Sequence, residues 1–88
     1  MTEYITLDMM KRDQLATVVS VDTEGAMRER LYDLGIVPDT KIRCVMKSPL
    51  GDPIAYLFRE AVIALRSEDS RNILVKLISE GGTENGTD

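Results

Sequence analysis

The strongest constraint on the fold of this chain is a helix that ends at Gly35. Met27, Leu31 and Leu34 stand at i, i+4 and i+7, the spacing that places apolar side chains on one face of an α-helix. Gly35 follows at the position where helices often end in a left-handed backbone conformation. Glycine adopts that conformation without a Cβ clash, so the sequence predicts a helix over Gly25–Leu34.

The residues after Gly35 direct the chain away from this helix. We expect Ile36 to fold back onto Leu31, the hydrophobic contact that accompanies such a helix end. Pro38 prevents the helix from resuming, because proline lacks a backbone N–H and clashes with the preceding turn. A folding role therefore explains this pattern without a ligand.

Five short segments are rich in apolar and β-branched residues and are predicted to be strands. In the second of them, Ile42, Cys44 and Met46 alternate with mostly polar residues, which places them on one buried face. The five segments are residues 16–21, 40–47, 53–58, 61–65 and 72–78. Five strands and one helix inserted after the first strand predict a mainly β protein, a small barrel.

The length of 88 residues predicts one domain with a modest core. Residues 1–78 carry the apolar segments and form the predicted folded domain. Residues 79–88, SEGGTENGTD, contain no large apolar side chain and are expected to be a disordered tail.

The composition opposes several classes of function and location. Eleven Lys and Arg against 15 Asp and Glu give a net charge of −4, which opposes binding to nucleic acid or to anionic lipid. A single cysteine suits a reducing cytosol, and no apolar run approaches the roughly 18 residues of a membrane span. The N-terminal residues do not resemble a secretory signal, so we expect a cytoplasmic protein.

The side chains needed for metal or catalytic chemistry are scarce. With no histidine and one cysteine, the chain cannot build a zinc or copper site from preferred ligands. Cys44 alternates with Ile42 and Met46 and is expected to be a buried apolar residue. Glu68 and Asp69 are adjacent, and adjacent carboxylates seldom converge on one ion. The sequence also lacks a glycine-flanked serine and a phosphate-binding GK[ST] pattern, so we expect no enzyme, no cofactor and no metal site.

The segment SPLGDP, residues 48–53, is the first candidate for a partner-binding site. Ser48, Pro49 and Gly51 occupy the positions that favour a type I turn, which would leave Leu50 at an exposed apex. A turn alone would explain the pattern, but an apolar side chain at a loop apex also indicates contact with a partner. The predicted site comprises Pro49, Leu50, Gly51, Asp52 and Pro53.

The polar side of the predicted helix is the second candidate. Arg28, Arg30 and Tyr32 lie there, and arginine and tyrosine are enriched at the centres of protein interfaces. The alternative is an ordinary solvated helix face.

The order of several short motifs resembles the FeoA family, small proteins that accompany bacterial ferrous iron transport. The resemblance covers about residues 7–77. The matching residues, in chain order, are Arg30-Leu31, Leu34-Gly35-Ile36, Pro38, Gly51-Asp52-Pro53, Ala64-Leu65-Arg66, Ile73 and Val75.

The family commonly has glycine where Asp13 and Asp39 stand, and near Glu60. Aspartate tolerates a left-handed backbone, so the first two changes are mild. Arg59-Glu60 is a poor pair for a two-residue hairpin turn, so we expect a longer or bulged loop there.

The resemblance implies an SH3-like five-stranded barrel with one inserted α-helix, no catalytic activity and a cytosolic site of action. It also implies a partner, the cytosolic part of the FeoB-type ferrous iron transporter, whose assembly or nucleotide turnover the chain would modulate. Contact with the membrane would then arise only through that partner. Separately, a sheet with an exposed edge strand could pair two copies of the chain in a homodimer.

Two alternatives stay open. Similar modules form the C-terminal domain of iron-dependent repressors, so the chain could be a metal-linked regulatory module. A third reading is a binder of proline-rich peptides, but such grooves are lined with aromatic side chains and the chain has only three Tyr, one Phe and no Trp.

Overall fold

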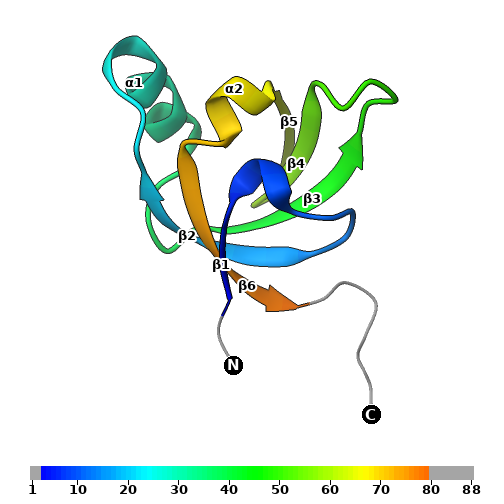
Figure 1. Ribbon diagram of the computed structural model, residues 1–88. Coiled ribbons are helices and arrows are strands. Elements are labelled where there is room, and N and C mark those ends of the chain that lie inside the picture. The colour runs from blue at the N-terminus through cyan, green and yellow to red at the C-terminus, as the bar shows by residue number, and fades with distance from the viewer. Residues whose placement is uncertain (1–2, 80–88) are drawn as a thin grey trace.

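The computed structural model describes residues 3–79, and Figure 1 shows a curved β-sheet with two helices above it. The elements in chain order are β1 (Tyr4–Thr6), the 3-10 helix η1 (Leu7–Met9), β2 (Leu15–Val21), α1 (Gly25–Leu34), β3 (Lys41–Lys47), β4 (Ile54–Phe58), β5 (Ala61–Leu65), α2 (Ser67–Ser70) and β6 (Ile73–Ser79).

All strands form one antiparallel sheet in the order β1-β6-β2-β3-β4-β5. The five predicted strands and the inserted helix are confirmed. A sixth strand, β1, was not predicted, because its three residues are too few to show an alternation of apolar and polar side chains. Its place in the sheet comes from pairing with β6. The single turn α2 escaped prediction for the same reason of length.

The core lies inside the curl of the sheet, with Tyr56 and Leu7 as its largest fully buried side chains. The hydroxyl of Tyr56 donates a hydrogen bond to the carbonyl of Leu7 at 3.2 Å, which joins β4 to η1. Burial raises the pKa of Tyr56 well above its ordinary value. Cys44 is fully buried, as predicted, and burial raises the pKa of its thiol as well.

The end of α1 has the predicted geometry. Gly35 has φ 102°, and its N–H donates to the carbonyl of Tyr32 at 3.0 Å. The N–H of Ile36 donates to the carbonyl of Leu31 at 2.9 Å, and both of these side chains are fully buried. These two bonds are those of a Schellman motif. The predicted apolar face is correct at Leu31 and wrong at Leu34, which is 40% exposed.

The predicted inward position of Met46 is also wrong. A β-bulge between Cys44 and Met46 shifts the pairing of β3 with β4, and Met46 is 58% exposed. An extra residue in one strand reverses the alternation beyond it, so Val45 marks the place where the pattern changes.

The turns account for the positions where the family favours glycine. Asp13 and Asp39 have φ 73° and 77°, so both adopt the left-handed backbone that aspartate tolerates. The expected long loop at Arg59-Glu60 is wrong, because Phe58 pairs directly with Ala61 and leaves two residues in the turn. Arg59 takes φ 58°, the conformation that glycine would otherwise provide.

The predicted tail begins at residue 79, and residues 80–88 lie outside the described residues, so its disorder stays a prediction. Within residues 3–79, no helix is both long and apolar enough to span a membrane.

Candidate partner-binding surfaces

The loop between β3 and β4 forms the predicted turn. The N–H of Gly51 donates to the carbonyl of Ser48 at 2.7 Å, which closes a four-residue β-turn. Leu50 is 94% exposed, so a large apolar side chain stands at the apex of the loop. A side chain exposed to this degree does not contribute to the core. An exposed apolar side chain also lowers solubility, so folding alone does not explain a leucine at this position.

Side-chain hydrogen bonds fasten this loop to its surroundings. The carboxylate of Asp52 accepts a hydrogen bond from the N–H of Ser67 at 2.7 Å and lies 4.0 Å from the guanidinium of Arg66. The hydroxyl of Ser48 donates to the carbonyl of Pro53 at 2.8 Å. The apex is therefore carried by a loop that is bonded across its base and to the start of α2.

The five predicted residues of this site divide into two roles. Pro49, Leu50 and Gly51 are exposed at the apex, where a partner can reach them. Asp52 is half-buried and Pro53 supplies a carbonyl acceptor, so both hold the loop in place.

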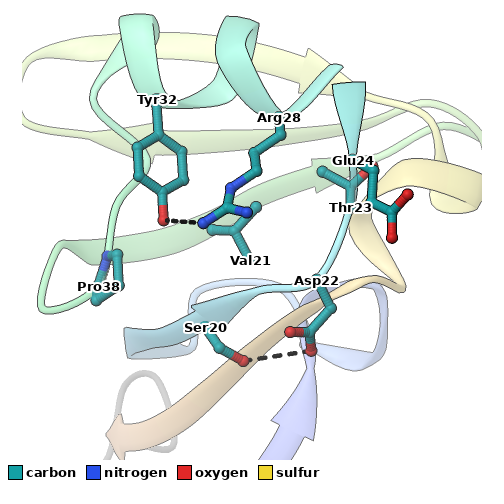
Figure 2. Close-up of a pocket in the computed structure, with 8 residues that line it drawn as sticks. All are labelled: Ser20, Val21, Asp22, Thr23, Glu24, Arg28, Tyr32 and Pro38. Atoms are coloured by element: carbon teal, nitrogen blue, oxygen red, sulfur yellow. Dashed lines mark hydrogen bonds between the residues drawn. The ribbon is translucent and has the colours of Figure 1, made fainter. Parts of the chain in front are cut away.

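Figure 2 shows the second surface, a hollow of about 400 Å³ beside α1. The guanidinium of Arg28 donates to the hydroxyl of Tyr32 at 3.4 Å, and its Cζ lies 5.2 Å from the centroid of the ring. The hydrogen bond with Tyr32 raises the pKa of Arg28. Asp22 and Glu24 line the same hollow, so it presents charges of both signs.

Arg30, the third predicted helix residue, does not join Arg28 and Tyr32. It lines a separate hollow of about 240 Å³ between α1 and the end of β5, because residues two positions apart point to different sides of a helix. The other residues that line this hollow are Met27, Ala64, Leu65, Arg66 and Asp69. Since Arg66 contacts Asp52, this hollow is linked to the base of the Leu50 loop.

The sequence did not predict that Arg66 and Asp69 line one hollow with Arg30. This arrangement depends on the junction of β5 with α2, where Arg66 separates the two elements and Asp69 lies in the single turn of α2. In the sequence, Ala64-Leu65-Arg66 is only part of the family pattern, and the contact of Arg66 with Asp52 is visible only in the folded chain.

Among residues 3–79, no three His, Cys, Asp or Glu side chains lie close enough together to hold a metal ion. Glu68 and Asp69, the adjacent carboxylates of the sequence, belong to the single turn of α2.

The FeoA domain family model matches residues 5–77. A curated relative from Porphyromonas gingivalis, the Fe(2+) transport protein A/Fe(2+) transporter FeoB fusion protein, is 37% identical over 68 residues. The match covers 77% of this chain and 8% of that relative, so the chain spans less than a tenth of its length.

Solved structures give the same result. An FeoA-like protein from Clostridium acetobutylicum superposes with a TM-score of 0.81 at 31% identity, over 98% of this chain and 100% of that one. FeoA from Stenotrophomonas maltophilia, described as an SH3 domain protein and solved with zinc, gives 0.72 at 29% identity over 81% of this chain and 88% of that one. The predicted SH3-like fold is thus confirmed, with six strands within residues 3–79 in place of the five predicted.

A manganese-dependent transcriptional repressor also superposes, with a TM-score of 0.78 over 85% of this chain and 41% of that one. Its identity of 20% shows a shared fold and nothing about function. The family model covers nearly the whole described chain, and the relatives at 31% and 37% identity agree with it. The chain therefore belongs to the FeoA family, which is linked to ferrous iron transport.

Proposed function

We propose that this chain is an accessory protein of bacterial ferrous iron transport that binds the cytosolic part of a FeoB-type transporter. It modulates the assembly or the nucleotide turnover of that transporter, and it acts by binding rather than by catalysis. In this proposal the chain is cytoplasmic and reaches the inner face of the membrane through its partner.

The observation that carries the proposal is the P. gingivalis relative, in which the FeoA-like part and the FeoB transporter share one polypeptide. Fusion of two proteins into one chain keeps them at high effective concentration, which is useful when they act together. A chain that matches only the FeoA-like part would supply the same contact as a separate protein.

We assign the main contact to the apex of the β3–β4 loop. Leu50 offers an unburied apolar side chain, and buried apolar anchors supply much of the affinity of protein interfaces. Because Asp52 and Ser48 already order the loop, docking would cost little additional conformational entropy. Arg30 and Arg66, which line one hollow beside this loop, offer positive charge at the rim of the contact.

The test is co-purification from the host of this protein. A tagged chain is expressed, membranes are solubilised gently, and the transporter is sought in the eluate for the wild type and for Leu50→Asp. The control is Tyr4→Asp, which replaces another exposed large side chain, 57% exposed, on β1 away from the loop in Figure 1. Circular dichroism confirms that both variants are folded.

Recovery of the transporter with the wild type and with Tyr4→Asp, and its loss with Leu50→Asp, would support both the role and the surface. Equal recovery with all three chains would keep the role and remove the loop from it. No recovery with any chain, together with unchanged iron uptake after deletion of the gene, would refute the proposal.

A further inference from the structure

The outer face of β4 is apolar. Ile54, Tyr56 and Phe58 of this strand are buried in the core. Because successive side chains of a strand point to opposite faces, Ala55 and Leu57 lie on the outer face of the sheet. An antiparallel sheet with one solvated face usually places polar side chains there. Folding therefore does not account for two aliphatic residues at these positions.

Strand pairing adds two more apolar side chains to this face. Met46 of β3 pairs with Ala55, and Val62 of β5 pairs with Leu57. Side chains that pair directly across two strands share a face and lie within contact of each other. Met46 is 58% exposed and Val62 is 61% exposed, whereas Ala55 and Leu57 are half-buried. We call these four residues the outer patch.

The outer patch is accessible beside α1. This helix borders the end of β5, where Met27 and Arg30 line one hollow with Ala64. Val62, two residues earlier in β5, does not line that hollow and is largely exposed. The β-bulge in β3 turns Met46 to the same face, at a distance of two strands from β5. A partner can therefore reach both side chains without displacing α1.

Basic side chains gather on the part of the chain that carries the outer patch. The whole chain has 11 Lys and Arg against 15 Asp and Glu, but residues 41–66 reverse this balance. The basic residues of this segment are Lys41, Arg43, Lys47, Arg59 and Arg66, and its acidic residues are Asp52 and Glu60.

Two of these basic residues stand on the outer face itself. Ile42 is buried, so Lys41 and Arg43 on either side of it point outward. Arg43 pairs directly with Leu57 of the outer patch. Its guanidinium donates a hydrogen bond to the carbonyl of Asp13 at 2.9 Å, which holds the side chain in place. The outer patch is thus an apolar surface with a positioned positive charge at its border.

We propose that the outer patch binds an acidic amphipathic segment from the cytosolic part of the transporter. The apolar side chains of that segment pack on Met46, Leu57 and Val62, and its carboxylates lie beside Lys41 and Arg43. An apolar centre with a polar, charged rim is the usual anatomy of a protein interface. This inference rests on the proposed function and adds to it a second surface and the chemistry of the partner.

The charge distribution explains why the partner is acidic. The net charge of −4 repels an acidic protein from most of the chain, whereas the basic residues of β3 attract it to the outer patch. Such complementarity fixes where a partner docks, and the attraction weakens as salt screens it. The Leu50 loop joins β3 to β4, so one partner can contact the loop and the outer patch together.

An anionic membrane would meet the same apolar and basic side chains, but the border of the outer patch disfavours it. Asp39 lines one hollow with Lys41 and Arg59. Glu60 follows Arg59 in the turn between β4 and β5. Lipid headgroups form a continuous negative plane that would meet these carboxylates as well as the basic residues. A single protein segment can lie on the outer patch and avoid them.

The test is isothermal titration calorimetry of the full chain against the purified cytosolic part of the host's transporter. The wild type should bind, with an affinity that falls as salt rises, because screening weakens the attraction between charges. Val62→Glu and Lys41→Glu should each weaken binding by about 10-fold or more, since each places a carboxylate against the acidic segment.

Each variant has a control. Val19→Glu makes the same substitution at an exposed valine of β2, outside the outer patch. Arg71→Glu reverses a charge at an exposed position after α2. Both should bind as the wild type does. Circular dichroism and thermal unfolding establish that each variant is folded, and Met46→Glu takes the place of Val62→Glu if that variant is not.

Weakened binding in both patch variants and full binding in both controls would support the proposal. Equal affinity for the wild type, Val62→Glu and Lys41→Glu would overturn it and leave the proposed function intact, with the Leu50 loop as the contact. A wild type that does not bind would overturn the proposal and the proposed function together. Binding to phosphatidylglycerol vesicles that is lost in Val62→Glu, with transporter binding unchanged, would make the membrane the occupant and overturn the proposal.

Discussion

The carboxylate of Asp52 accepts a hydrogen bond from the backbone N–H of Ser67 at 2.7 Å, so the β3–β4 loop caps the start of α2. The four first N–H groups of a helix lack partners within it, and Arg66, the residue before α2, provides no side-chain cap. Asp52 supplies that cap from a distant part of the chain. The same bond fixes the base of the loop that carries Leu50.

We predict that Asp52→Ala lowers the free energy of unfolding by about 0.5–2 kcal/mol, the usual range for loss of a helix cap. Urea denaturation measures the change. Asp52→Asn keeps an oxygen acceptor and loses only the contact with Arg66, so it should fall between the wild type and the alanine variant. An alanine variant as stable as the wild type would show that the cap is replaced by water.

The helix end at Gly35 is expected to resist substitution. At φ 102° an alanine is strained by its backbone, because a Cβ at this position would lie at ordinary contact distances, 3.4 Å from Cζ of Arg59 and 3.5 Å from Cε2 of Phe58. Gly35→Ala should lower the free energy of unfolding by about 1–2 kcal/mol. Gly25→Ala should lose less, because φ 67° lies within the left-handed region that residues with a Cβ can adopt. Equal losses in the two variants would contradict this dependence on φ.

The two-residue turn between β4 and β5 offers a stabilising change. Arg59 holds φ 58°, which is unfavourable for most side chains, whereas Glu60 does not have a positive φ. Arg59→Gly should raise the free energy of unfolding by about 0.5–1 kcal/mol, as glycine removes the strain. Glu60→Gly should lower it, because it only adds freedom to the unfolded chain. A gain at Glu60 and none at Arg59 would contradict this account.

The sequence sufficed for those parts of the fold that local physics determines. The spacing of Leu31, Gly35 and Ile36 predicted the helix end and its left-handed glycine, because a Schellman motif involves only neighbours in the chain. Ser48 and Gly51 likewise predicted their own turn. The apolar apex at Leu50 followed from that turn.

The errors lie where distant contacts override local pattern. Met46 turns outward because β3 bulges against β4, and Leu34 stays exposed because the inserted helix meets the core mainly through Leu31. The separation of Arg30 from Arg28 could have been predicted from helical spacing, since two positions span more than half a turn. The contact of Asp52 with Ser67 could not, because it joins segments 15 residues apart that meet only in the folded chain.

The last prediction concerns alkaline pH. Burial raises the pKa of Cys44 above its ordinary value of 9.0 and that of Tyr56 above its ordinary value of 10.0. The folded chain then holds protons that the unfolded chain releases, so stability falls as pH rises. The contribution of both groups is complete below pH 9 and is lost progressively above it, first from Cys44 and then from Tyr56. Urea denaturation between pH 7 and pH 11 should show this decline, and Cys44→Ala should delay its onset. A decline that begins at the same pH in Cys44→Ala would exclude the thiol as its cause.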